Sequence, residues 1–140
     1  MKLTYENDIS YEDYKLLRAA VGWREVSERQ YKAALKYTPY LAVIKDNGSA
    51  IGMLKGLGDN GYYWLLSDLI IHPDFQGLGL GRKLVEDFLI YVENQMQIGE
   101  KYVIHLASSK GKEAFYEKFG FKSRPFDTFG AGMSLFKEKI

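Results

Sequence analysis

The chain of 140 residues contains no cysteine. This absence excludes disulfide bonds, thiolate metal ligands and cysteine nucleophiles, so any catalytic chemistry has to come from other side chains or from the backbone. The net charge is only +1, which gives no general attraction to nucleic acid or to a membrane surface. We therefore expect neither a nucleic-acid partner nor a membrane partner.

Long hydrophobic runs are also missing. The first residues lack the apolar centre of a signal peptide, and no apolar run approaches the roughly 20 residues that a bilayer-spanning helix needs. Hydrophobic residues make up 46% of the chain and charged residues 26%, which is typical of a soluble globular protein. We expect a cytoplasmic protein with a single domain over residues 1–140.

Local signals predict a mixed sheet with helices on both faces. Capping boxes at Ser10 and Ser27 open two helices, and Asp46-Asn47-Gly48 is typical of a hairpin turn. The expected elements are strand 2–6, helices 10–21 and 27–36, strands 40–45, 49–57 and 62–72, a helix from residue 80 toward residue 99, strand 102–107, helix 112–119, and a last hairpin of strands over residues 121–137. This order favours an α/β or α+β mixed fold.

A glycine-rich loop, Gln76-Gly77-Leu78-Gly79-Leu80-Gly81-Arg82, connects the longest expected strand to the longest expected helix. Backbone N–H groups of such a loop and of the first helical turn have no partners within the chain. The helix dipole adds about half a positive charge at that end. The loop is therefore suited to hold a phosphate group. A tight turn alone would explain one or two glycines, but not three in alternation.

Two common phosphate motifs do not fit this loop. A Walker A loop requires G-x-x-x-x-G-K-[ST], but Arg82 stands where the last glycine should be, and no Lys-Ser or Lys-Thr pair follows. A dinucleotide fingerprint requires G-x-G-x-x-G, and the windows that begin at Gly77 and Gly79 both lack the last glycine. A third pattern, Q-x-x-G-x-G, fits residues 76–81 without a gap.

Residues 69–84 resemble motif A of the GCN5-related N-acetyltransferases, and residues 114–121 resemble motif B, which reads F-Y-x-x-x-G-F from Phe115 to Phe121. The order of the motifs and the gap of about 35 residues between them also match. The resemblance covers about residues 40–125. It implies an acetyl-CoA-dependent N-acetyltransferase without a metal, built on a mostly antiparallel sheet with a splayed pair of parallel strands.

The resemblance further implies that the pyrophosphate of acetyl-CoA lies on the glycine loop and the pantetheine arm along the strand before it. A backbone N–H at Leu69 or Ile71 would polarise the thioester carbonyl. Arg82 either adds a charge near the phosphates or is a solvated helix residue, and Ser108 or Lys110 would replace an asparagine that many relatives carry. The implied cofactor-binding residues are Leu69, Ile70, Ile71, Gln76, Gly77, Leu78, Gly79, Leu80, Gly81, Arg82, Ser108, Lys110, Phe115 and Tyr116.

Tyr116 matches the catalytic tyrosine of the family, which implies a general acid. An amine that attacks a thioester expels a thiolate. Free thiols have a pKa of about 8.5 and phenols of about 10, so a nearby phenol can protonate the leaving sulfur. The alternative is that Tyr116 is only a packed aromatic beside Phe115 and Phe119.

The general base is poorly marked. Asp68 lies on the strand before the loop, where some relatives carry their base, but a lone acid there can equally cap a backbone group. The other candidates are Glu25, His72 and His105. Some relatives need no base, because they accept an amine that is already neutral.

The acceptor site is expected where the link between the first two helices meets the C-terminal hairpin. This nominates Trp23, Arg24 and Tyr31, with Tyr63 and residues 126–133 as further candidates. No charged tract points to a macromolecular partner, so we expect a small-molecule amine that attacks directly in a ternary complex. A protein or peptide amine is the nearest alternative, followed by a CoA-binding sensor without turnover and by a different nucleotide ligand. The resemblance also allows a homodimer.

Overall fold

The computed structural model describes residues 1–140, which form two compact units, Met1–Leu106 and Ala107–Ile140. The expectation of a single domain over residues 1–140 stays a prediction. No helix combines the length and the apolar character that a membrane crossing requires.

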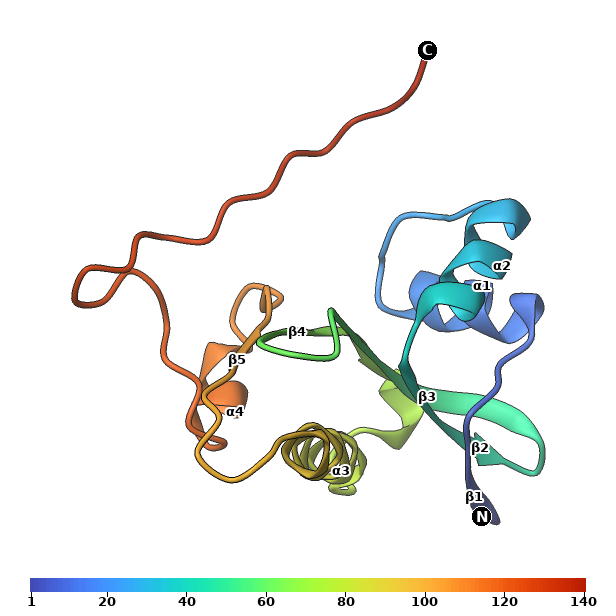
Figure 1. Cartoon of the computed structure of the whole chain (residues 1–140). Helices are drawn as coiled ribbons and strands as arrows, with labels where there is room; N and C mark the ends of the chain where they lie inside the picture. The colour runs from blue at the N-terminus through green and yellow to red at the C-terminus, as the bar shows by residue number, and fades with distance from the viewer. The chain divides into compact units, whose positions relative to one another are not determined.

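A five-stranded sheet with its strands in sequence order organises the first unit (Figure 1). Strands β1 to β4 pair antiparallel, and β5 runs parallel to β4. The predicted mixed fold, with a mostly antiparallel sheet and one parallel pair, is confirmed. The strands are β1 (Leu3–Glu6), β2 (Tyr40–Asp46), β3 (Ser49–Gly58), β4 (Tyr63–Ile71) and β5 (Val103–His105).

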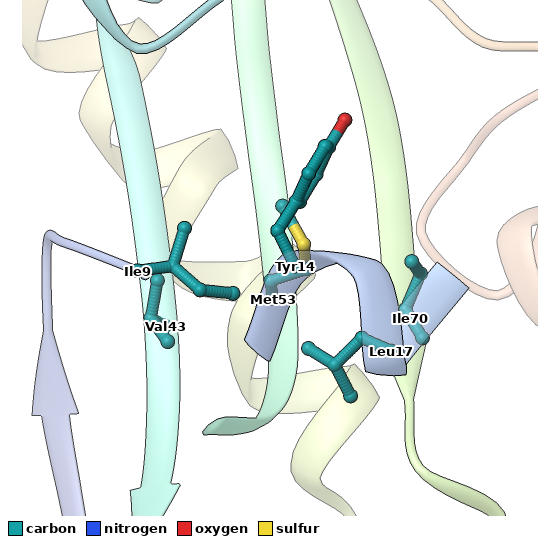
Figure 2. Close-up of a cluster of buried hydrophobic side chains, with 6 residues drawn as sticks. All are labelled: Ile9, Tyr14, Leu17, Val43, Met53 and Ile70. Carbon is teal, nitrogen blue, oxygen red and sulfur yellow. The ribbon is translucent and has the colours of Figure 1, made fainter. Parts of the chain in front are cut away.

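Helices α1 (Tyr11–Ala20) and α2 (Glu28–Tyr37) lie on one face of this sheet. The hydroxyl of Ser10 caps α1, and Ser27 with Gln30 forms a complete capping box at α2, so both helices begin where the sequence predicts. A buried apolar cluster joins α1 to the sheet, as Figure 2 shows. Its members are Ile9, Tyr14, Leu17, Val43, Met53 and Ile70.

Helix α3 (Leu80–Gln95) covers the opposite face, as Figure 1 shows. Its buried residues Leu80, Leu84, Val85, Phe88 and Val92 form one side of the helix. The ring of Phe88 lies so close to β3 that a Cβ atom on Gly56 would come within 2.2 Å of it. Gly56 therefore lets the helix approach the sheet, and α3 in turn fixes the position of the glycine loop at its N-terminus.

Strand β4 parts from β5 after Leu65 and then carries a bulge. Lys55 pairs with Ser67 and Met53 with Ile70, so Asp68 and Leu69 both face the single residue Leu54 of β3. Pairing with β5 extends only from Tyr63 to Leu65. The remaining part of β4 has no partner strand on that side, which leaves its backbone groups there available for another extended group.

The second unit contains α4 (Glu113–Glu117) and a set of aromatic side chains around it. The ring of Phe115 contacts Tyr116 and Phe119, and Tyr116 also contacts Phe121. Gly120 follows with a φ of +96°, a left-handed conformation that ends the helical run as the sequence predicts.

The predicted C-terminal hairpin of strands is wrong. Residues 121–140 form no strand, and only an isolated bridge joins Phe126 to Phe129. Figure 1 draws the last residues as an extended tail. A hairpin with no sheet or helix beneath it is marginal in water, and Gly130 and Gly132 lower the strand propensity further. The apolar residues of the tail did suggest a strand, but no partner strand is paired with them.

Candidate active site

The turn after β4 is held by side chains of its own sequence. The amide of Gln76 donates to the carbonyl of Ile71 at 3.0 Å, and the backbone N–H of Asp74 donates to Nδ1 of His72 at 3.1 Å. Pro73–Phe75 forms a short 3-10 turn between them. His72 thus serves the turn, and Gln76 ties the start of the glycine loop to the end of the strand.

The glycine loop has the backbone geometry that its sequence predicts. Gly77 and Gly79 have φ angles of +80° and +78°, and Gly79 is the N-cap of α3 without any side-chain cap. Lys83 is the first residue to donate within the helix, to the carbonyl of Gly79, so the preceding N–H groups have no helical partner. A Cβ atom on Gly77 or Gly79 would meet nothing within 4 Å. The loop therefore presents free donors to open space, which fits the pyrophosphate of acetyl-CoA.

Arg82 lies on the exposed side of α3, where its Nε contacts a carboxylate oxygen of Glu86 at 2.7 Å. This contact raises the pKa of Arg82. The side chain is thus engaged along the helix, and its role near a phosphate stays a prediction.

The outer edge of β4 follows from its pairing with β3. The N–H of His72 donates to the carbonyl of Ile51, and hydrogen bonds alternate along an antiparallel pair. Ile70 is therefore the residue that exchanges both bonds with Met53. The backbone groups of Leu69 and Ile71 consequently point to the side that β5 has left. This edge can accept an added strand-like ligand.

Asp68 sits in the bulge with a φ of +48°, a conformation that is uncommon for residues other than glycine. Its Oδ2 accepts the hydroxyl of Tyr14 at 2.9 Å, and Lys55 Nζ lies 3.2 Å and Arg18 Nη1 3.5 Å from the same oxygen. No motif in the sequence marks Tyr14, Arg18 or Lys55 as partners of Asp68. A weak signal existed, because Tyr14 and Arg18 are four residues apart on one face of a helix.

The pKa of Tyr14 is raised to about 12, chiefly by burial and then by the charge of Asp68 and the hydrogen bond to it. The phenol is therefore neutral at physiological pH and remains a hydrogen-bond donor to Asp68.

Two of the residues nominated for the acceptor site, Trp23 and Arg24, contact Arg18. Arg18 lies over the ring of Trp23 at 5.6 Å and donates from Nε to the carbonyl of Arg24 at 2.8 Å. Tyr31 packs on the ring of Tyr14, and its hydroxyl donates to the carbonyl of Ile9. Burial raises the pKa of Tyr31. These side chains thus also support the link between α1 and α2.

The other candidate bases lie apart from Asp68. His105 stands on β5 with its ring against Tyr63 at 6.1 Å, and Glu25 is exposed in the link between α1 and α2. No three carboxylate or imidazole side chains gather into a group that could hold a metal ion.

The remaining candidates belong to the second unit. Ser108 donates its hydroxyl to the carbonyl of Ser109 at 2.8 Å, and Lys110 is exposed in the same loop. Tyr116 is half-buried among aromatic rings, and burial raises its pKa. A raised pKa keeps the phenol protonated to a higher pH, as a proton donor requires.

Comparison with known proteins agrees with this geometry. Residues 38–123 match the model of the acetyltransferase (GNAT) domain. The chain is 31% identical over 127 residues to the uncharacterized N-acetyltransferase ycf52 of Porphyra purpurea, covering 88% of this chain and 71% of the relative. It is 30% identical over 129 residues to the histone acetyltransferase TAP1 of Glycine max, covering 84% of this chain and 54% of the relative.

A crystal structure of a probable acetyltransferase from meticillin-resistant Staphylococcus aureus has the same fold, with a TM-score of 0.85 and 23% identity. The match covers 97% of this chain and 100% of that one. The family model covers more than half of the chain, and the solved structure has the same arrangement of strands and helices. The chain therefore belongs to the GNAT family of N-acetyltransferases and is an acyltransferase, in a family that uses acetyl-CoA as the acetyl donor.

Proposed function

We propose that the protein transfers an acetyl group from acetyl-CoA to the primary amine of a small molecule, by direct attack in a ternary complex. The observation that carries this proposal is the glycine loop, in which left-handed Gly77 and Gly79 leave the first N–H groups of α3 without partners. Acetyl-CoA supplies an activated thioester when it is bound. The residues of the chain bind it, orient it and supply a proton.

Binding is assigned to the loop and to the edge of β4. The N–H groups of residues 78–82 bind the pyrophosphate oxygens, helped by the dipole of α3. The carbonyl of Ile71 already accepts the amide of Gln76, so the backbone groups of Leu69 and the N–H of Ile71 bind the pantetheine arm and polarise the thioester carbonyl. Ser108, Lys110 and Phe115 complete the cofactor site in this proposal.

Proton removal from the amine follows one of two routes. Either Asp68 accepts the proton, or the amine loses it to water before it binds. Tyr14, Lys55 and Arg18 already approach Oδ2 of Asp68, and these contacts favour the second route. Proton delivery to the leaving sulfur is assigned to Tyr116.

Tyr116→Phe is expected to lower kcat by about 100-fold, the low end of the range for general acid catalysis, because it removes only the phenolic proton donor. Acetyl-CoA affinity should stay unchanged, since the ring is retained. The measurements are thiol release with a reactive amine and calorimetric titration of acetyl-CoA. Tyr37→Phe on the exposed surface of α2 is the matched control. An unchanged kcat in Tyr116→Phe would contradict the assignment.

The class of acceptor separates this proposal from its alternatives. The proposal expects small amines, amino acids or amino sugars to release CoA faster than peptides in a thiol-release panel. The relative TAP1 is named a histone acetyltransferase, so lysine peptides represent the protein-acceptor alternative. If acetyl-CoA binds but no amine or peptide releases CoA, the chain is a CoA-binding sensor.

A cytoplasmic location stays a prediction that fractionation of cells would test.

We also propose that the protein forms a homodimer through residues 131–140. Met133 and Leu135 in this extended segment are 96% and 84% exposed, and exposed apolar segments mark protein interfaces. The double variant Met133→Ser/Leu135→Ser is expected to convert the dimer to a monomer, as measured by light scattering after gel filtration. Lys137→Ser/Lys139→Ser in the same segment is the control. A wild-type chain that is monomeric at micromolar concentration would refute this proposal.

A further inference from the structure

A group of four polar side chains, here called the bulge cluster, surrounds the bulge of β4. It consists of Tyr14, Arg18, Lys55 and Asp68. The side chains of Arg18, Lys55 and Asp68 are only 15%, 12% and 13% exposed. All four belong to the first unit, so their distances are fixed within one compact body. The cluster is thus largely buried and held by contacts among its own side chains. Its four residues lie outside the two sequence motifs that the family shares.

The bulge cluster carries one more positive charge than negative. Arg18 and Lys55 are cations, Asp68 is the only carboxylate, and the phenol of Tyr14 is neutral because its pKa is raised to about 12. The neighbouring carboxylate of Asp13 is directed elsewhere, since it accepts the backbone N–H of Ala50 at 3.0 Å. A charge held in a partly buried site is costly unless an opposite charge approaches it.

The cations also have hydrogen-bond donors to spare. Tyr14 and Lys55 both contact Oδ2 of Asp68, whereas Nη1 of Arg18 lies between the two carboxylate oxygens, at a long 3.5 Å from each. A guanidinium has five N–H donors and an ammonium three. Arg18 uses Nε on the carbonyl of Arg24. Donors thus remain on both cations, and they are suited to the oxygens of a further anion.

The position of the cluster connects it to the acceptor amine. Asp68 lies where β4 has parted from β5, on the face that α1 covers. Figure 2 shows the hydroxyl of Tyr14 pointing away from the apolar side chains of that face. The ring of Trp23 flanks Arg18. The bulge cluster thus lies next to the part of β4 that has no partner strand beside it.

We propose that the acceptor amine carries an anionic group, a carboxylate or a phosphate, which Lys55 and Arg18 bind. This inference rests on the proposed acetyl transfer and names its substrate class. One acceptor carboxylate would bring the bulge cluster to neutrality. A polycationic acceptor would instead place like charges together, which disfavours its binding. The ring of Trp23, which flanks Arg18, provides an apolar wall beside the bound anion.

The test compares acceptors that differ only in their anionic group. Leucine is paired with leucinamide to test a carboxylate, and glucosamine 6-phosphate with glucosamine to test a phosphate. CoA release is measured at saturating acetyl-CoA and at equal concentrations of neutral amine. We expect at least one anionic member to have a kcat/KM at least tenfold above that of its neutral partner, and spermidine to be slower than either.

Variants test whether the bulge cluster is the cause. Lys55→Met is expected to reduce the preference for the anionic member by about tenfold through KM, while Lys55→Arg keeps it. Lys32→Met on the exposed surface of α2 is the control, because its side chain is 72% exposed. The comparison of anionic with neutral acceptors uses the unmodified chain, so it remains valid even if a variant does not fold.

Equal or lower kcat/KM for the anionic members of both pairs overturns the inference. So does an anionic preference that survives in a folded Lys55→Met chain. If neutral amines are acetylated efficiently, the acetyl transfer stands and only the acceptor class fails. If acetyl-CoA binds and no amine releases CoA, the proposed function fails, and the acceptor inference fails with it.

Discussion

Gly79→Val is expected to weaken acetyl-CoA binding by about 100-fold or more. Gly79 has a φ of +78° and caps α3, a conformation that a β-branched residue avoids. The loop would relieve the strain by rotating, so its N–H groups would no longer converge on one point. Loss of two hydrogen bonds to a charged phosphate costs about 1.5–3 kcal/mol each, and each 1.4 kcal/mol is about a factor of ten in affinity.

Gly99→Val separates the loss of the phosphate site from backbone strain alone. Gly99 also has a left-handed φ, +90°, and a Cβ there would likewise meet nothing within 4 Å. It lies beyond the other end of α3, which ends at Gln95. Thermal unfolding should therefore show similar destabilisation in the two variants, and calorimetry should show lost acetyl-CoA binding only in Gly79→Val. Loss of even one hydrogen bond to the phosphate should weaken binding more than about threefold. An acetyl-CoA affinity of Gly79→Val within that factor of the unmodified chain would therefore contradict the assignment of the loop.

Much of the first unit could be predicted because its signals are local. Ser27 and Gln30 bond to each other's backbone within one turn, and Asn47 with Gly48 adopts the positive φ angles of a hairpin turn. The alternating glycines after Gln76 require no distant partner to form a donor-rich loop. Each of these patterns carries its own geometry, so the helices, the turn and the backbone of the glycine loop could be predicted from the sequence, while phosphate binding by the loop stays a prediction.

The predicted C-terminal hairpin is wrong because a strand pair depends on contacts that are not local. Met133 and Leu135 alternate with polar residues as a strand does, but a strand is stabilised by a paired neighbour and by burial of one face. Neither condition is encoded in the segment itself. The chain shows only an isolated bridge at Phe126, and the apolar side chains of the tail remain exposed. The alternation of apolar and polar residues therefore indicates a propensity for strand, but it does not show whether a partner strand is present.

The bulge cluster could not be predicted, because it depends on register. Tyr14 and Arg18 reach Asp68 across separations of 54 and 50 residues. Asp68 meets them only because β4 holds two residues opposite Leu54, and a bulge re-aims the side chains that follow it. The sequence named Asp68 as a candidate base from its place before the loop. It did not reveal the cations beside it.

Asp68→Asn is expected to destabilise the protein by about 3 kcal/mol, the lower end for breaking a buried ion pair, because the side chain is still 13% exposed. Asparagine keeps the size of the side chain and tolerates the left-handed backbone, so the change mainly leaves Arg18 and Lys55 without an anion. Urea unfolding measures the loss. Asp68→Asn/Lys55→Met should recover part of the loss, and a double variant as unstable as the sum of the singles would contradict this account.

The titration of Tyr14 gives an independent readout of the same contact. Its pKa, raised to about 12, owes most to burial and the next part to the charge of Asp68. In Asp68→Asn the pKa should fall, yet stay above the ordinary value because burial remains. The raised pKa stabilises the fold fully below about pH 10, the ordinary phenol value, and this contribution is lost as the pH rises toward 12. Phenolate absorbance, taken as the difference from the Tyr14→Phe chain, follows this transition.

The activity of the folded Asp68→Asn chain then separates the two roles of Asp68. If Asp68 accepts the amine proton, Asp68→Asn should lower kcat/KM by about 10²- to 10⁴-fold, even where the chain is fully folded and saturated with acetyl-CoA. If Asp68 holds the bulge, the loss of activity should follow the loss of folded protein and of acetyl-CoA affinity. We expect the second result, because Oδ2 already meets Tyr14, Lys55 and Arg18. A bulge that is held rigidly keeps the backbone of Leu69 and Ile71 aimed at the edge to which we assign the thioester. In this proposal the strand contributes that geometry to acetyl transfer, more than a proton acceptor.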